Sequence, residues 1–75
     1  VNLPEEIFNY LNNLTILYIT YNNIRTLPNS LFYNLYKLEC LDLSNNSINC
    51  LSLHFTNLIG LKELNLSNNI SVNII

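Results

Sequence analysis

The stretch LECLDLSNNSI, residues 38–48, determines the fold of this 75-residue chain. Leu41 and Leu43 alternate with less apolar residues, and this period of two is typical of a half-buried β-strand. Three residues later stands Asn46, whose amide is a poor core group unless it has hydrogen-bond partners. Ile48 then resumes the apolar pattern. The asparagine therefore needs a structural reason for its place among core residues.

The stretch belongs to an internal repeat. LPEEIFNYLNNLTILYITYNNI (3–24) aligns with LPNSLFYNLYKLECLDLSNNSI (27–48) at a shift of 24 residues. A third copy, LSLHFTNLIGLKELNLSNNIS (51–71), follows with one residue deleted near its start. This repetition predicts a single domain, 1–75, built from repeats at about 3–26, 27–50 and 51–75.

Aligned residues form columns that predict the core. The strand columns are Leu14, Leu38 and Leu61; Leu17, Leu41 and Leu64; and Ile19, Leu43 and Leu66. The columns between the strands are Phe8, Phe32 and Phe55, and Leu11, Leu35 and Leu58. The asparagine column is Asn22, Asn46 and Asn69.

The spacing of the copies predicts a parallel sheet. Each L-x-L core is followed by about twenty residues before the next, which is too long for a hairpin and suits a crossover. Such crossovers are right-handed. We therefore expect strands at roughly 16–20, 40–44 and 63–67 along one face of a coil.

The pattern L-x-x-L-x-L-x-x-N-x-I, with L-P-x-x-L-F-x-x-L between copies, resembles the leucine-rich repeat family. Residues 14–24 and 38–48 match it throughout, and 61–69 match it until Ser71 replaces the expected isoleucine. The repeat length resembles the typical subclass of Toll-like receptor and matrix or adhesion ectodomains. This resemblance implies an α/β right-handed solenoid, with a parallel sheet on the concave face and irregular or short helical convex segments. It also implies a protein–protein recognition module, part of a signalling receptor or adhesion ectodomain.

Asn46 is explained by the turn that follows each strand. That turn leaves backbone N–H and C=O groups inside the coil, and an amide side chain can both donate to and accept from them. We expect stacked asparagines to form a ladder, and Asn46→Ala to destabilise the protein by more than about 1 kcal/mol. By contrast, Asn45 is expected to point to solvent, so that Asn45→Ala is nearly neutral.

Composition excludes several classes of partner. The net charge is −2, and three scattered basic residues (Arg25, Lys37 and Lys62) cannot form the cationic stripe that nucleic acid requires. No apolar run approaches the ~18–20 residues that span a bilayer, so we expect no direct membrane insertion.

Catalytic, metal and cofactor sites are not expected. Two cysteines and one histidine lack zinc-ligand spacing. His54 aligns near the core, where a structural role is expected, and the core would separate it from Cys40. The single glycine, Gly60, excludes a phosphate-binding loop. The sequence therefore predicts no enzyme, no metal and no cofactor.

The predicted concave face carries the candidate partner-binding residues. Outward strand positions give the columns Ile16, Cys40 and Glu63; Tyr18, Asp42 and Asn65; Thr20, Ser44 and Ser67; and Tyr21, Asn45 and Asn68. From these we select Tyr18, Tyr21, Cys40, Asp42, Asn45, Glu63 and Asn65 as contacts for a protein or peptide ligand. Tyr18 and Tyr21 are the best anchors, because tyrosine offers a large contact area with few rotatable bonds.

The sequence gives opposing indications about where the protein is located. N-glycosylation sequons occur at Asn13, Asn45, Asn65 and Asn69, and Asn13 and Asn65 are the candidate glycosylation sites. Asn69 belongs to the ladder and is expected to be inaccessible. Cys40 and Cys50 are not expected to pair, and free thiols favour a reducing compartment. The resemblance to the typical extracellular subclass implies an extracellular or cell-surface location, with a cytoplasmic scaffold as the alternative.

Two further expectations concern the architecture. The repeats could instead be the regulatory or recruiting arm of a larger enzyme, such as a receptor kinase or ubiquitin ligase. Both solenoid ends expose sheet edges and apolar surface, which permits oligomerisation through these ends.

Overall fold

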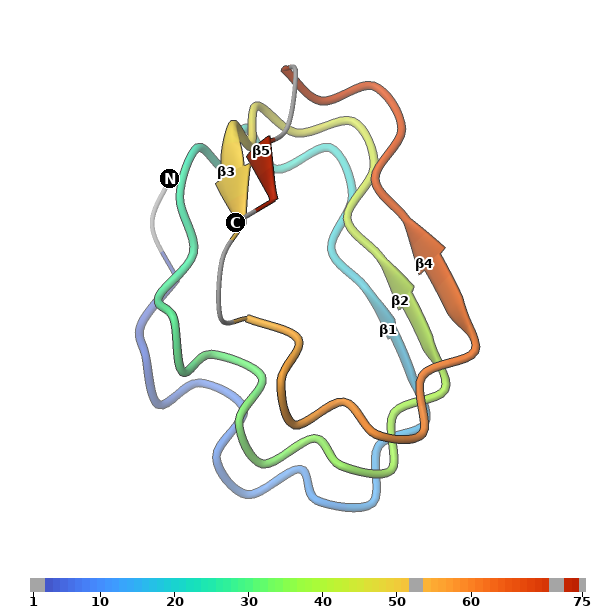
Figure 1. The fold of residues 1–75 in the computed structure, drawn as a ribbon. Coiled ribbons are helices and arrows are strands. Elements are labelled where there is room, and N and C mark those ends of the chain that lie inside the picture. Colours follow the sequence, from blue (N-terminus) through green and yellow to red (C-terminus); the bar gives the residue numbers. More distant parts are fainter. Residues whose placement is uncertain (1–2, 52–53, 71–72, 75) are drawn as a thin grey trace.

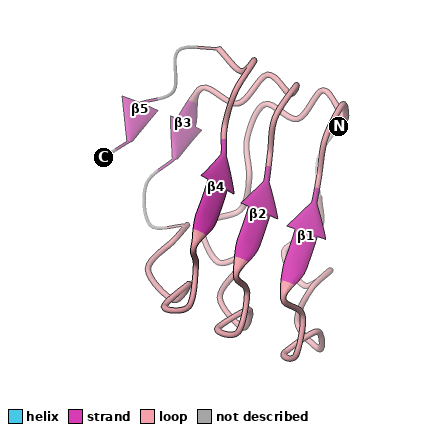
Figure 2. Ribbon diagram, turned by 90° about the vertical axis from the view of Figure 1, so that its right-hand side faces the viewer, coloured by secondary structure: helices cyan, strands magenta, loops and turns pink. Residues whose placement is uncertain are grey.

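The computed structural model describes residues 3–51, 54–70 and 73–74. Viewed end-on, the chain winds in successive turns, with one sheet along one side of the coil (Figure 1). The strands of that sheet are β1 (Ile16–Tyr18), β2 (Cys40–Asp42) and β4 (Glu63–Asn65), in the order β1-β2-β4. They lie side by side and parallel (Figure 2). This arrangement fits the repeat solenoid that the sequence predicts.

The register of the sheet confirms the alignment of the repeats. Leu41 pairs with Leu17 and with Leu64, as the shift of 24 residues and the single deletion require. Each strand begins at its predicted residue but ends two residues early. The inter-strand hydrogen bonding nevertheless continues past the strand ends. Ile19 N–H donates to the Asp42 carbonyl at 2.8 Å, and Asn45 N–H donates to the Ser67 carbonyl at 3.0 Å.

The segments that return from one strand to the next contain no helix in the described part of the chain, so the expectation of short helices is wrong. Tight turns replace them, with backbone N–H groups donating to carbonyls three residues earlier. In the second repeat these bonds link Leu31 to Pro28, Tyr33 to Ser30, Leu35 to Phe32 and Leu38 to Leu35. These turns follow one another but do not form a continuous helical hydrogen-bond pattern. The return segments are therefore irregular, which was the other form expected for them.

A second small sheet was not predicted. β3 (Cys50–Leu51) and β5 (Asn73–Ile74) pair in parallel, away from the first sheet (Figure 1). Each of these two strands has only two residues, and an alternating hydrophobic pattern cannot be recognised over so short a stretch.

The middle repeat forms the centre of the core. Its fully buried side chains are Leu31, Phe32, Leu35, Leu38, Leu41, Leu43 and Ile48. The equivalent residues of the outer repeats are more exposed, and Leu11 and Leu64 retain 43% and 39% of their accessible surface. A repeat is buried by its neighbours on both sides, so the two end turns are only partly covered.

Asn46 joins adjacent turns of the coil, which confirms the predicted ladder. Its Nδ2 donates to the carbonyls of Ile19, Leu43 and Ser44 at 2.7, 3.0 and 3.2 Å. Its Oδ1 accepts from the backbone N–H groups of Asn22 and Ile24 at 2.9 and 3.2 Å. The amide thus pairs buried backbone groups of two repeats at once.

Asn69 repeats this arrangement one turn later. Its Nδ2 donates to the Leu43 and Leu66 carbonyls at 2.9 and 3.0 Å, and its Oδ1 accepts from Ile48 N–H at 2.9 Å. Asn69 is half-buried, so the expectation that it is inaccessible is wrong.

On the opposite side of the coil, aromatic rings stack through the repeats. Phe32 lies between Phe8 and Phe55, with centroid distances of 6.3 and 6.5 Å and interplanar angles of 14° and 11°. His54 is buried beside Phe55, and its Nε2 lies 2.8 Å from the Leu27 carbonyl, so this nitrogen carries the hydrogen. This confirms the structural role expected for His54.

A second set of asparagines, missed in the sequence, links the return segments. Asn34 Nδ2 donates to the Asn9 carbonyl at 3.2 Å, and Asn57 Nδ2 donates to the Tyr33 carbonyl at 3.0 Å. Asn34 and Asn57 align with Tyr10, so this column is broken in the first repeat.

We predict that Asn46→Ala lowers the free energy of unfolding by about 2 kcal/mol or more, because buried N–H and C=O groups lose their partners. Asn49→Ala, at an exposed position three residues away, is the matched control and should cost less than about 0.5 kcal/mol. Urea unfolding midpoints measure both changes. Equal midpoints for the two variants would contradict the ladder.

The residue before each ladder asparagine adopts a left-handed backbone. Tyr21, Asn45 and Asn68 have φ values of 58°, 59° and 57°. This conformation costs L-residues roughly 1–2 kcal/mol, less for asparagine, and nothing for glycine. The left-handed backbone of Asn45 therefore changes the expectation that Asn45→Ala is nearly neutral, because that expectation rested on the side chain alone.

We therefore predict that Asn45→Ala destabilises the protein by about 1 kcal/mol, whereas Asn45→Gly changes the free energy of unfolding by a few tenths. Chemical denaturation of both variants separates backbone strain from side-chain contacts. An equal loss in both would assign the effect to the asparagine side chain instead.

Candidate functional site

Six side chains define the solvent-facing side of the β1–β2–β4 sheet, called the concave face below. Leu17 and Leu41 pack in the core, so the residues flanking them in each strand point outward. The register aligns Ile16, Cys40 and Glu63 in one row across the strands, and Tyr18, Asp42 and Asn65 in the next.

These rows surround a shallow, open hollow of about 460 Å³. Its lining residues are Tyr18, Cys40, Leu41, Asp42, Lys62, Glu63, Leu64 and Asn65. Five of the seven predicted contact residues thus lie together: Tyr18, Cys40, Asp42, Glu63 and Asn65. A second, mostly apolar hollow lies beside Tyr33 on a return segment and contains none of them.

The other two predicted contacts, Tyr21 and Asn45, lie beyond the strand ends. Their left-handed backbones place them in the turns between strand and ladder asparagine, not in the sheet. Tyr21 is 77% exposed, whereas Asn45 is half-buried, with its Nδ2 3.4 Å from the Ser44 hydroxyl. Neither lines the hollow.

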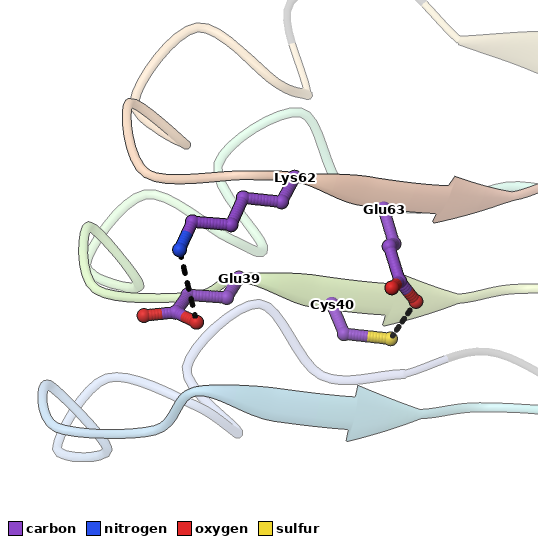
Figure 3. A network of polar contacts seen from close by, with 4 residues as sticks. All are labelled: Glu39, Cys40, Lys62 and Glu63. Carbon is purple, nitrogen blue, oxygen red and sulfur yellow. Dashed lines mark hydrogen bonds and ion pairs between the residues drawn. The ribbon is translucent and has the colours of Figure 1, made fainter.

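Cys40 lies at the centre of the concave face. Its thiol donates to Glu63 Oε2 across the neighbouring strand at 3.6 Å (Figure 3). Partial burial, this hydrogen bond and the charges of Glu63 and Asp42 all raise the pKa of the Cys40 thiol. Because the thiolate is the reactive form, the site makes Cys40 a weak nucleophile at neutral pH.

Asp42 is held in its ionised form. Hydrogen bonds from the hydroxyl and backbone N–H of Ser44 lower the pKa of the Asp42 carboxyl, and Asn65 adds to this effect. The Ser44 N–H lies 2.9 Å from Asp42 Oδ1. A lowered pKa gives stability that is present above the ordinary aspartate pKa and is lost as the pH falls through the lowered value.

The same local motif ends two of the strands. Asn65 Oδ1 accepts from the N–H and hydroxyl of Ser67 at 3.0 and 2.7 Å, as Asp42 accepts from Ser44 two residues on. Ser44 is buried, which corrects its predicted place on the concave surface, whereas Ser67 in the end repeat is exposed. Asp42 and Asn65 therefore shape the turns while still lining the hollow.

Lys62 also lines the hollow and was missed by the sequence reasoning. It precedes the alternating strand positions, so the period-two pattern gave no reason to select it. Its Nζ lies 3.7 Å from Glu39 Oε1, and both side chains are exposed (Figure 3). This ion pair directs the ammonium group away from Glu63.

The candidate glycosylation sites differ in their surroundings. Asn13 is exposed, and its Oδ1 accepts from Lys37 Nζ at 3.1 Å. Asn65 is exposed on the concave face itself. Cys40 and Cys50 are both free thiols.

The described residues lack two features of other protein classes. No three histidine, cysteine or carboxylate side chains come together there as metal ligands. Nor does that part of the chain contain a helix with the length and hydrophobicity needed to cross a bilayer.

Comparison with known proteins gives one result. The family model for the leucine rich repeat matches two overlapping stretches, residues 1–48 and 12–70. Neither a curated protein nor a solved structure matches the chain.

We predict that Glu63→Gln accelerates alkylation of Cys40 by iodoacetamide at pH 8, because losing the carboxylate lowers the thiol pKa and raises the thiolate fraction. A Cys50→Ser background leaves one thiol to report. Glu39→Gln is the control, since Glu39 contacts Lys62 and not Cys40. Equal alkylation rates in the two variants would remove Glu63 as a cause of the raised pKa.

Proposed function

Because this chain belongs to the leucine-rich repeat family, whose domains generally bind other proteins, we propose that its concave face recognises a protein or peptide ligand. The family is typically a non-catalytic binding module. The ligand would contact side chains that the parallel strands hold at fixed separations. Tyr18, Cys40, Asp42, Glu63 and Asn65 are the proposed contacts.

The observation that carries this proposal is the exposure of Tyr18 beside the hollow. Its side chain is 66% exposed on β1, next to Asp42 on β2. A rigid aromatic ring with a hydroxyl group is a common anchor at protein interfaces. Tyr21, 77% exposed in the following turn, extends the aromatic surface beyond the strand end.

We further propose that the chain acts in a signalling receptor or adhesion ectodomain outside the cell. Exposed sequon asparagines at Asn13 and Asn65 support this setting. The alternative is an intracellular scaffold, and the free thiols of Cys40 and Cys50 favour it. Mass spectrometry of the native protein decides between them: glycans on Asn13 or Asn65 require secretion, whereas unmodified asparagines with reduced cysteines favour the cytosol.

We predict that Tyr18→Ala weakens binding of selected peptides by about tenfold or more, because Tyr18 supplies the largest apolar contact beside the hollow. The peptides come from a display library of short random sequences, selected on the immobilised intact protein. Isothermal calorimetry gives the dissociation constants.

Tyr36→Ala is the matched control, because Tyr36 is a 45% exposed tyrosine on a return segment. Its affinity for the same peptides should remain within about twofold of the unmodified protein. If Tyr36→Ala weakens binding and Tyr18→Ala does not, the recognition surface lies on the return segments and the concave-face proposal fails.

A further inference from the structure

The concave face changes in chemistry from one edge to the other. On β1, Ile16 and Tyr18 are 55% and 66% exposed and carry no charge. On β2 and β4, the same two rows continue to Asp42 and Glu63, which carry carboxylates. Neighbouring strands are about 4.8 Å apart, so Asp42 lies about 5 Å and Glu63 about 10 Å from β1, and the midpoint between the two carboxylate positions lies about 7 Å from β1.

The two carboxylates have no cation of their own. Among the described residues the one ion pair is Lys62 with Glu39. Lys37 instead donates to Asn13 Oδ1. Asp42 and Glu63 therefore present unneutralised negative charge to whatever enters the hollow, in a chain of net charge −2.

Cys40 lies between Ile16 and Glu63 in one row of the sheet and adds no charge there. Its thiol is protonated and donates to Glu63 Oε2. Cys40 itself lines the hollow, which extends from Tyr18 on β1 to Glu63 and Asn65 on β4. A ligand segment can thus cross the strands from one edge to the other.

We propose that the ligand of the concave face is an extended peptide segment that carries an apolar side chain and a basic side chain two residues apart, on the same face of the segment. The inference rests on the proposed function and specifies its ligand. In an extended chain, side chains two residues apart lie on the same face and about 7 Å from each other, which matches the distance from β1 to the midpoint between Asp42 and Glu63. The apolar side chain packs on Ile16 and Tyr18.

The basic side chain binds between Asp42 and Glu63. These residues lie on neighbouring strands and are diagonal to each other in the register, since Asp42 pairs with Asn65 and Glu63 with Cys40. Arginine suits this position best, because its planar guanidinium can donate to two carboxylates at once and can lie against the ring of Tyr18.

The test uses peptides selected from the random display library on the intact protein. Selected sequences should be enriched in arginine or lysine two positions from an apolar residue. Glu63→Gln should weaken their binding by about three- to tenfold and reduce its sensitivity to salt. Asp42→Asn, which keeps an oxygen to accept from Ser44, should have an effect in the same range.

Glu6→Gln is the matched control, because it removes one exposed carboxylate from a return segment and should leave affinity unchanged. Selected peptides that lack basic residues but lose affinity in Tyr18→Ala would overturn this inference and leave the proposed function intact. Peptides that bind equally to the Tyr18, Asp42 and Glu63 variants would overturn both.

Discussion

The amide of Asn46 is the interaction on which the rest of the structure depends. A coil of short strands must turn after each one, and each turn places backbone groups where water cannot reach them. Asn46 pairs five such groups from two repeats. Without it, the turn after β2 would bury donors and acceptors that have no partners, at about 1–3 kcal/mol each. The apolar columns supply burial, but they do not satisfy these groups.

The ladder also fixes the concave face. Asn46 reaches back to the first repeat, and Asn69 reaches back to the second, so each amide sets the position of one turn of the coil on the previous one. The phenylalanine stack does the same on the far side. With both sides fixed, the strands pair in one register, and the order of side chains across the hollow follows from that register. The proposed binding surface is therefore positioned by residues that do not line it.

Features that recur in all three repeats could be predicted from the sequence, whereas features confined to one residue could not. The repeat columns predicted the strand pairing, the ladder and the buried position of His54, because three copies report the same environment. The left-handed backbone of Asn45 was missed, since a side-chain pattern contains no dihedral angle. Ser44 is buried although alternation along the strand placed it on the surface, because the chain has left the strand at this residue and the middle repeat is covered on both sides.

In all three strands the residue that packs inward is the same, whereas the residues that face solvent differ from repeat to repeat. At the core position of the strands every repeat has leucine: Leu17, Leu41 and Leu64. The positions on either side differ in every repeat, so that each row across the sheet holds three different chemistries. Packing constrains the first set because interiors are close-packed and tolerate little change in volume. Packing does not constrain the flanking positions in this way, because their side chains face solvent. A shape common to the family can thus carry a surface specific to this chain, here apolar at β1 and anionic towards β4.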